Sequence, residues 1–191
     1  MSDPAVTLET ERLVLRRSVP DDAEAISAYR SDPQVHRHQG WDRTDPEAVR
    51  ASIEEMAGRA PGEPGGWVQF SVHERGGDEV VGDVGLSPAE DEPGVIKVGF
   101  TMSPAVQGRG YATEAVGALI DYALDELGAD VVRAYASAEN LPSIRVMEKT
   151  GMRLMEKFEH HSGDETWFGV RYERERRPGR AGDAAGPPTS A

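Results

Sequence analysis

Apolar and polar residues alternate in several short runs of the chain, which is the pattern of half-buried β-strands. Residues 12–17 (RLVLRR) alternate in this way. Three consecutive later runs are rich in β-forming residues and are separated by turns, as in a meander. We predict strands over residues 12–17, 67–74, 79–86, 95–102, 131–136, 152–158 and 165–173.

Helical spacing or helix-start residues mark four other segments. The longest segment, 111–127, repeats apolar residues every three or four positions and ends before Gly128. Asp45 and Pro46 are typical residues for the first positions of a helix. We predict helices over residues 20–31, 45–57, 111–127 and 141–150.

The order of these elements predicts an α/β fold of the mixed α+β kind, with a central twisted sheet of about seven strands flanked by helices. A strand, a helix and a strand follow one another between residues 95 and 136, which implies a parallel crossover and a mixed sheet. Residues 178–191 lack large apolar side chains and are rich in Gly, Pro and Ala. We therefore expect one domain over residues 1–177 and a disordered tail over 178–191.

Composition narrows the class of protein. No apolar run approaches the ~20 residues that span a bilayer, and the first residues carry no signal-peptide pattern, so we expect a soluble cytoplasmic protein. The chain has no cysteine, which excludes disulfides, a thiol nucleophile and thiolate metal ligands. Lys and Arg number 21 against 34 Asp and Glu, and the resulting net charge of −13 disfavours nucleic acids. This charge would attract amines or basic peptides, or it serves solubility alone.

Residues 106–115 join a predicted strand to the longest predicted helix and hold the strongest candidate chemistry. Gly108 and Gly110 would let the backbone approach a ligand closely. The unpaired N–H groups of the first helical turn form an anion site suited to a pyrophosphate, to which Arg109 could add a contact. A Gly-rich turn that only reverses the chain is the alternative. The segment is neither a P-loop nor a Gly-x-Gly-x-x-Gly loop.

Within this segment, Gln107-Gly108-Arg109-Gly110-Tyr111-Ala112 resembles the Gln/Arg-x-x-Gly-x-Gly/Ala signature with which the GNAT N-acetyltransferase superfamily binds acetyl-CoA. Flanking segments resemble elements of its RimJ/RimL branch, and the likeness covers about residues 8–173. These segments are 8–13 (first strand), 97–102 (splayed fourth strand), 140–143 (Asn-x-x-Ser) and 148–152 (Glu-Lys-x-Gly-Phe). The resemblance implies the GNAT fold, with its sheet splayed at the acetyl-CoA site.

The resemblance further implies direct acetyl transfer from acetyl-CoA to an amine in a ternary complex. Backbone N–H groups of residues 107–112 would bind the pyrophosphate, and an amide near Val98 or Gly99 would polarise the thioester carbonyl. Asn140 would bond the pantetheine arm and Ser143 would donate to the leaving thiolate; capping of the next helix is the alternative for both. The strand residues expected to bind the pantetheine are Val98, Gly99, Phe100, Thr101 and Met102.

Two positions depart from the family pattern. Met147 stands where many relatives have a tyrosine general acid, and Lys97 stands where the branch often has a glutamate general base. A lysine is a poor base at neutral pH unless its pKa is depressed. The base could instead be Asp83, the acids at 90–92 or a histidine acting through water, or bulk water could take the proton.

The resemblance implies that the segment 35–41, between the two early predicted helices, lines the pocket for the acceptor. We expect His38, Trp41 and Asp83 to contact the acceptor, with packing of the loop by Trp41 as the alternative. The acceptor would be a peptide or protein N-terminus, or a small cationic metabolite or antibiotic. A homodimer is compatible with the family.

Two further expectations concern metals and activity. Adjacent His160 and His161 would point to opposite faces of a strand, so we expect no metal site. The alternative function is a non-catalytic acyl-CoA-binding or sensing domain with the same fold. Lys97 and Met147, which replace two usual catalytic residues, motivate this alternative.

Overall fold

The structure of the chain is a computed structural model that describes residues 6–39, 44–162 and 165–177. The strands are β1 (Thr7–Glu9), β2 (Leu13–Arg17), β3 (Val68–Glu74), β4 (Val80–Pro88), β5 (Val95–Met102), β6 (Val131–Ser137), β7 (Arg153–Ser162) and β8 (Glu165–Glu175). The α-helices are α1 (Ala23–Arg30), α2 (Pro33–His36), α3 (Pro46–Met56), α4 (Tyr111–Asp121) and α5 (Leu141–Lys149). The tail expected at 178–191 lies outside the described residues.

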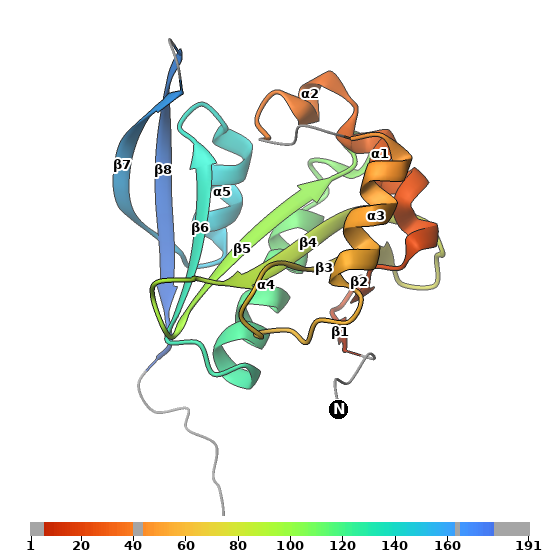
Figure 1. Cartoon of the computed structure of the whole chain (residues 1–191), viewed down its shortest axis with the longest axis horizontal. Coiled ribbons are helices and arrows are strands. Elements are labelled where there is room, and N and C mark those ends of the chain that lie inside the picture. The colour runs from red at the N-terminus through yellow and green to blue at the C-terminus, as the bar shows by residue number, and fades with distance from the viewer. Residues whose placement is uncertain (1–5, 40–43, 163–164, 178–191) are drawn as a thin grey trace, which may run out of the picture.

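The strands form one sheet in the order β1-β2-β3-β4-β5-β6-β8-β7 (Figure 1). Neighbouring strands are antiparallel except β5 and β6, which run parallel and confirm the predicted crossover. The sheet has eight strands where we predicted about seven, because Thr7–Glu9 pairs with residues 14–16 as a short edge strand. Three residues are too few to show an alternating pattern.

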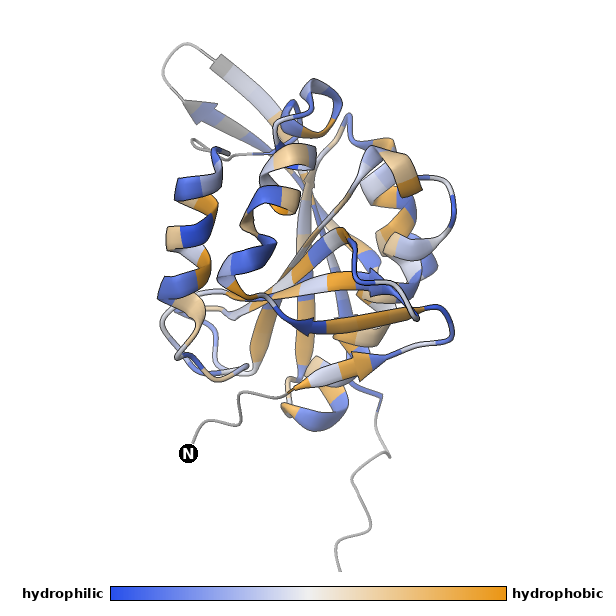
Figure 2. Ribbon diagram, turned by 90° about the vertical axis from the view of Figure 1, so that its right-hand side faces the viewer, coloured by the Kyte–Doolittle hydropathy of each residue, from blue (hydrophilic) through white to orange (hydrophobic). Residues whose placement is uncertain are grey.

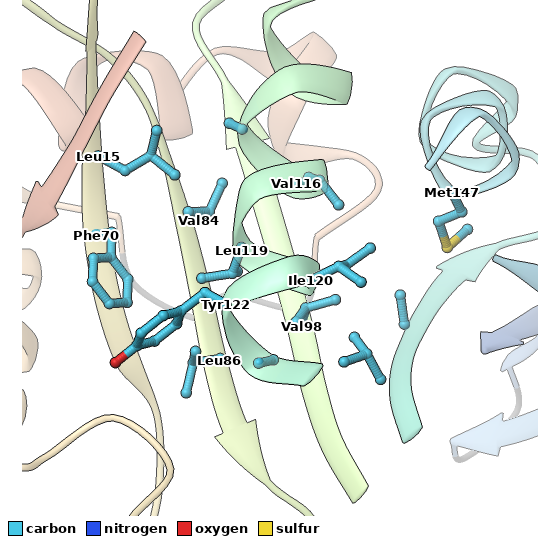
Figure 3. Packing of buried hydrophobic residues seen from close by; sticks show 14 of the residues in the cluster. Leu15, Phe70, Val84, Leu86, Val98, Val116, Leu119, Ile120, Tyr122 and Met147 are labelled. Carbon is cyan, nitrogen blue, oxygen red and sulfur yellow. The ribbon is translucent and has the colours of Figure 1, made fainter. Parts of the chain in front are cut away.

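Helices cover both faces of the sheet, as the side view in Figure 2 shows. The main core lies between the sheet and α4, with a contribution from α5 (Figure 3). Its buried side chains include Leu15, Phe70, Val84, Leu86, Val98, Val116, Leu119, Ile120 and Met147. Full burial of one such side chain contributes roughly 1.5–3 kcal/mol, so this layer holds α4 and the loop before it firmly on the sheet.

The other face of the sheet, under α1 and α3, is polar. On β3, Gln69, Ser71 and His73 alternate with the core residues and therefore point to this side. Ser71 donates to the carboxylate of Asp22, which also accepts two hydrogen bonds from Arg16. Only a small apolar cluster, drawn from α1, α3 and β4, packs here among the described residues.

Most predicted elements are present with boundaries that shift by a few residues. Residues 20–31 begin with a 3-10 turn (Pro20–Asp22), and 111–127 ends in a π-helical turn (Tyr122–Glu126). The short helix α2 was missed, although Asp32 accepts from the Gln34 N–H as a helix cap and Pro33 follows it. Among the described residues, no helix has the length and apolarity needed to cross a bilayer.

β5 and β6 separate partway along their length. Their ladder pairs residues 95–97 with 131–133, yet β5 continues to Met102 and β6 to Ser137. The backbone edge of β5 from Val98 onward is therefore open toward β6. This opening confirms the predicted splay and leaves an edge that an extended ligand can pair with.

Candidate active site

Two cavities adjoin the open end of β5. Cavity A, of about 470 Å³, is lined by α2 and the turn after it, the end of β5, the loop before α4, the first turn of α4 and one face of α5. Cavity B, of about 370 Å³, lies between the sheet and helices α1 and α3. Gln39, Phe100 and Thr101 line both cavities, so the two meet at the end of β5.

The loop before α4 presents unpaired N–H groups to cavity A. Gly108 and Gly110 have φ values of +79° and +83°, a left-handed conformation that favours glycine. Gly110 is the N-cap of α4. Within the described part of the chain, no acceptor takes the N–H of Gly108, Gly110, Tyr111 or Ala112. Free donors and the positive end of the helix dipole therefore coincide, as an anion site requires.

Long-range hydrogen bonds fix this loop to the turn between β1 and β2. Glu114 in the first turn of α4 accepts from the Thr10 hydroxyl at 2.6 Å, the Arg12 backbone N–H at 2.8 Å and Arg12 Nε at 2.7 Å. Burial acts to raise the pKa of Glu114, but these hydrogen bonds outweigh it and hold that pKa below its usual value. Arg12 also donates to the carbonyl of Arg109. The loop is therefore held in shape by the protein itself.

The side chain of Arg109 is engaged away from cavity A. Its guanidinium pairs with Glu74 at 2.8 Å and lies over the Tyr111 ring, 4.7 Å from the ring centroid. Arg12 lies over the same ring at 4.9 Å. Arg109 does not line cavity A, whereas Gln107, whose Nε2 donates to the Met102 carbonyl, does. The phosphate contact expected of Arg109 would require its pair with Glu74 to open.

Asn140 and Ser143 line cavity A together at the start of α5. Asn140 is 9% exposed, and its Oδ1 accepts from the Ser143 N–H at 3.2 Å. The capping alternative is therefore confirmed for Asn140, and its Nδ2 remains as a donor. Ser143 contributes only its backbone to the cap, and its hydroxyl has no hydrogen-bond partner among the described residues.

β5 contributes different residues to the two cavities. Met102 lines cavity A and Gly99 lines cavity B, while Phe100 and Thr101 line both. The side chain of Val98 is buried in the core beneath α4 (Figure 3), so only its backbone can reach a ligand.

Asp83 of β4 lies almost fully buried in the wall of cavity B. It accepts from the Tyr29 hydroxyl at 2.5 Å and from Arg30 Nη2 at 2.8 Å. Burial, reinforced by the charge of Asp83, raises the pKa of Tyr29 well above its usual value, so Tyr29 stays protonated as a donor. Both carboxylate oxygens of Asp83 are thus already engaged.

Trp67 forms another wall of cavity B that the sequence analysis did not single out. Its indole lies against Gly85 and Gly99, which face each other across β4 and β5. A Cβ at Gly85 would come within 3.3 Å of the ring, so glycine makes room for it. Gln69 beside it is buried, and its Nε2 has no partner in the described residues. The signal in the sequence was a glycine in each of two consecutive predicted strands, Gly85 and Gly99, which leaves room for a large side chain.

The two predicted acceptor contacts that the structure describes line different cavities. His38 lines cavity A and Asp83 lines cavity B. Trp41 lies outside the described residues. No group of three His, Asp or Glu side chains that could hold a metal ion is found in the described ranges.

The positions that depart from the family pattern lie outside both cavities. Lys97 belongs to the paired part of β5, and Met147 is fully buried in the core (Figure 3), where it is a packing residue. The acids at 90–92 line neither cavity. Glu92 pairs with Arg133, and this hydrogen bond holds the pKa of Glu92 below its usual value. These acids are therefore poorly placed to act as the base.

The sequence matches one protein family along most of its length. Residues 12–153 match the family described as acetyltransferase (GNAT) domain. The chain is also 31% identical over 166 residues to the uncharacterized N-acetyltransferase p20 of Bacillus licheniformis. That match covers 82% of this chain and 89% of p20.

Solved structures share the fold. An acetyltransferase of the GNAT family from Bacillus anthracis superposes with a TM-score of 0.79 and 28% identity, over 90% of this chain and 99% of that one. RimL, a ribosomal L7/L12 alpha-N-protein acetyltransferase in complex with coenzyme A, superposes with a TM-score of 0.74 and 13% identity, over 89% and 98%. The likeness to RimL concerns the fold alone.

Proposed function

Because the chain belongs to the GNAT acetyltransferase family, we propose that it transfers an acetyl group from acetyl-CoA to a primary amine by direct attack in a ternary complex. The observation that carries this proposal is the meeting of cavities A and B at Phe100 and Thr101, beside the open edge of β5. A thioester held in cavity A and an amine held in cavity B would come together at this point.

The chemistry of cavity A supports its use for acetyl-CoA. The free N–H groups of Gly108, Gly110, Tyr111 and Ala112 suit a pyrophosphate. The open edge of β5 from Val98 onward suits the amides of the pantetheine arm. Bound there, acetyl-CoA supplies the activated acetyl thioester.

The proposed reaction forms one carbon–nitrogen bond and breaks one carbon–sulfur bond. The neutral amine nitrogen attacks the thioester carbonyl carbon, and the coenzyme leaves as its thiolate. A backbone amide of Val98 or Gly99 stabilises the developing oxyanion. Ser143, whose hydroxyl has no partner among the described residues, donates a hydrogen bond to the leaving thiolate, and the attacking nitrogen loses one proton to solvent.

The acid and base assignments follow from what the side chains already do. Asp83 accepts from Tyr29 and is paired with Arg30, which makes it a wall and positioning residue of cavity B rather than a free base. We therefore propose that water accepts the proton of the acceptor's ammonium group. Positioning of the amine beside the thioester then supplies most of the rate acceleration.

The acceptor is a primary amine on a small molecule or on a peptide N-terminus. A cavity of about 370 Å³ lies in the usual range of small-molecule sites. Trp67 offers an aromatic face to a cationic or apolar group. RimL, which has the same fold, is named as acting on a protein N-terminus, and this supports a peptide as an acceptor.

A second candidate is an acyl-CoA-binding or sensing domain without catalytic activity. It is favoured by Met147, which cannot donate a proton and is buried in the core, and by Lys97, which replaces a carboxylate. This candidate predicts acetyl-CoA binding without transfer.

The test is thiol release from acetyl-CoA across a panel of amines, peptide N-termini and aminoglycoside-like compounds, together with the thermal shift that acetyl-CoA causes. Selective turnover is the expected result. A thermal shift without turnover across the panel would favour the binding domain. Absence of both signals would overturn the assignment of cavity A to acetyl-CoA.

A further inference from the structure

The lining of cavity A has a charge opposite to that of the whole protein. The chain carries a net charge of −13, yet cavity A is lined by Arg37, Arg145 and Lys149 and by no Asp or Glu of the described residues. Cavity B, by contrast, holds one arginine and one aspartate that pair with each other. The described lining of cavity A therefore carries positive charge that no carboxylate of this lining offsets.

Two of these cations stand together on α5. Arg145 and Lys149 are four residues apart and so lie on one face of the helix, about 6 Å apart along its axis. Nine arginines in the described ranges pair with a carboxylate, whereas neither Arg145 nor Lys149 makes an ion pair there. Glu148 between them accepts from the Tyr172 hydroxyl instead. Both cations are exposed and available to a ligand.

The remaining cation, Arg37, belongs to the other end of cavity A. It lies two residues from Gln39, which lines both cavities and therefore marks the side where they meet. Arg145 and Lys149 lie beyond Ser143 along α5, so the cavity has a cationic end separate from the proposed reaction point.

We propose that Arg145 and Lys149 bind the 3′-phosphate of coenzyme A and make the protein prefer acetyl-CoA to its 3′-dephospho form. This inference rests on the proposed function. The coenzyme carries two separate anionic groups, the pyrophosphate and the 3′-phosphate monoester. The loop N–H groups serve the first, and a phosphate dianion on the ribose needs charged donors of its own, which these two side chains supply.

The test compares the dissociation constants of coenzyme A and 3′-dephospho-coenzyme A, measured by calorimetry at one fixed salt concentration. The wild-type protein should bind coenzyme A about tenfold or more tightly, as expected for charge-assisted hydrogen bonds. The double variant Arg145→Gln/Lys149→Gln should bind the two ligands about equally, because only coenzyme A loses affinity. Arg153→Gln/Lys157→Gln on β7 removes the same charge from exposed positions outside cavity A and should keep the wild-type preference.

The outcomes separate this inference from the function it rests on. Equal loss of affinity for both ligands in the α5 variant would overturn the 3′-phosphate assignment and point to the pyrophosphate or to long-range charge. Equal affinity of both ligands for the wild-type protein would also overturn it. If the wild-type protein bound neither ligand, the proposed function would fail and this inference with it.

Discussion

At Gly110 the backbone meets two requirements at once. Its φ of +83° is a conformation that costs other residues roughly 1–2 kcal/mol, and its N–H is one of the free donors that face cavity A. A Cβ here would also lie 3.4 Å from Arg12 Nη2, in the contact network that fixes the loop. Glycine is therefore needed both for the turn and for a ligand to approach.

We predict that Gly110→Val weakens acetyl-CoA binding at least about tenfold, because strain of this size displaces the donors. The matched control is Gly76→Val, since Gly76 has a similar φ of +77° in the turn after β3 and open space around it. Thermal shift with acetyl-CoA, read beside circular dichroism, gives the comparison. An unchanged shift in Gly110→Val would reject the pyrophosphate assignment.

Ser143 gives the second prediction at this scale. Ser143→Ala should lower kcat about tenfold while changing the Kd of acetyl-CoA less, because it removes one hydrogen bond to the developing thiolate. Stability should hold, since the cap uses the Ser143 N–H and not its hydroxyl. Asn140→Ala, which removes the cap, should instead cost about 1 kcal/mol of unfolding free energy. Wild-type kcat in Ser143→Ala would leave Ser143 without a chemical role.

At the scale of elements, the geometry of the site comes from two strands that separate and from a helix that stays packed on the sheet beside them. The ladder between β5 and β6 stops after three pairs, while the core beneath α4 keeps the loop before α4 beside the opening. Gly85 of β4 and Gly99 of β5 face each other, and the space above these two glycines is filled by the Trp67 indole. The splay and the indole thus define the two cavities.

We predict that Trp67→Ala raises the KM for the amine about tenfold and leaves acetyl-CoA affinity unchanged, because Trp67 lines cavity B and not cavity A. Trp167→Ala is the matched control, since Trp167 on β8 is 43% exposed against 42% for Trp67 and lines neither cavity. Steady-state kinetics with both substrates varied would test this. A rise in the acetyl-CoA KM alone would show that the amine site lies elsewhere.

At the scale of the whole molecule, polar burial on one face of the sheet links stability to pH. His73 of β3 is 5% exposed, with Nδ1 near the Asp78 carbonyl at 3.2 Å. Burial first, and then the charge of Arg16, lower the pKa of His73 below 6.5, although Asp22 and the carbonyls of Asp78 and Glu79 act against this. The unfolded chain therefore binds the proton at a higher pH than the folded one.

It follows that the free energy of unfolding should fall as the pH drops below about 6.5, with the contribution of His73 complete above that value. His73→Gln cannot take up the proton and should lose less stability between pH 7 and pH 5. His161→Gln, at an exposed position of β7, should behave as the wild type. Urea unfolding across this pH range is the measurement, and parallel curves for wild type and His73→Gln would refute the linkage.

Local sequence patterns predicted most of the secondary structure and part of the sheet topology. Alternation and helical spacing located seven strands and four helices, because a half-buried element must repeat its apolar residues with its own period. The strand–helix–strand order indicated the parallel crossover, since parallel strands need a long connection. The motif at 107–112 predicted the loop whose N–H groups are free, because its glycines and the start of the helix are neighbours in sequence.

Other features depend on residues that are distant in sequence, and only the tertiary structure decided them. The Thr10–Glu114 hydrogen bond spans 104 positions, and the engagement of Arg109 by Glu74 spans 35. The positive lining of cavity A is likewise a result of the fold. The fold places Arg37, Arg145 and Lys149 at the cavity and the carboxylates of this acidic chain elsewhere. Periodicity reports which face of an element is buried, whereas pairing of charges, separation of β5 from β6 and the walls of the cavities are set by how those faces meet.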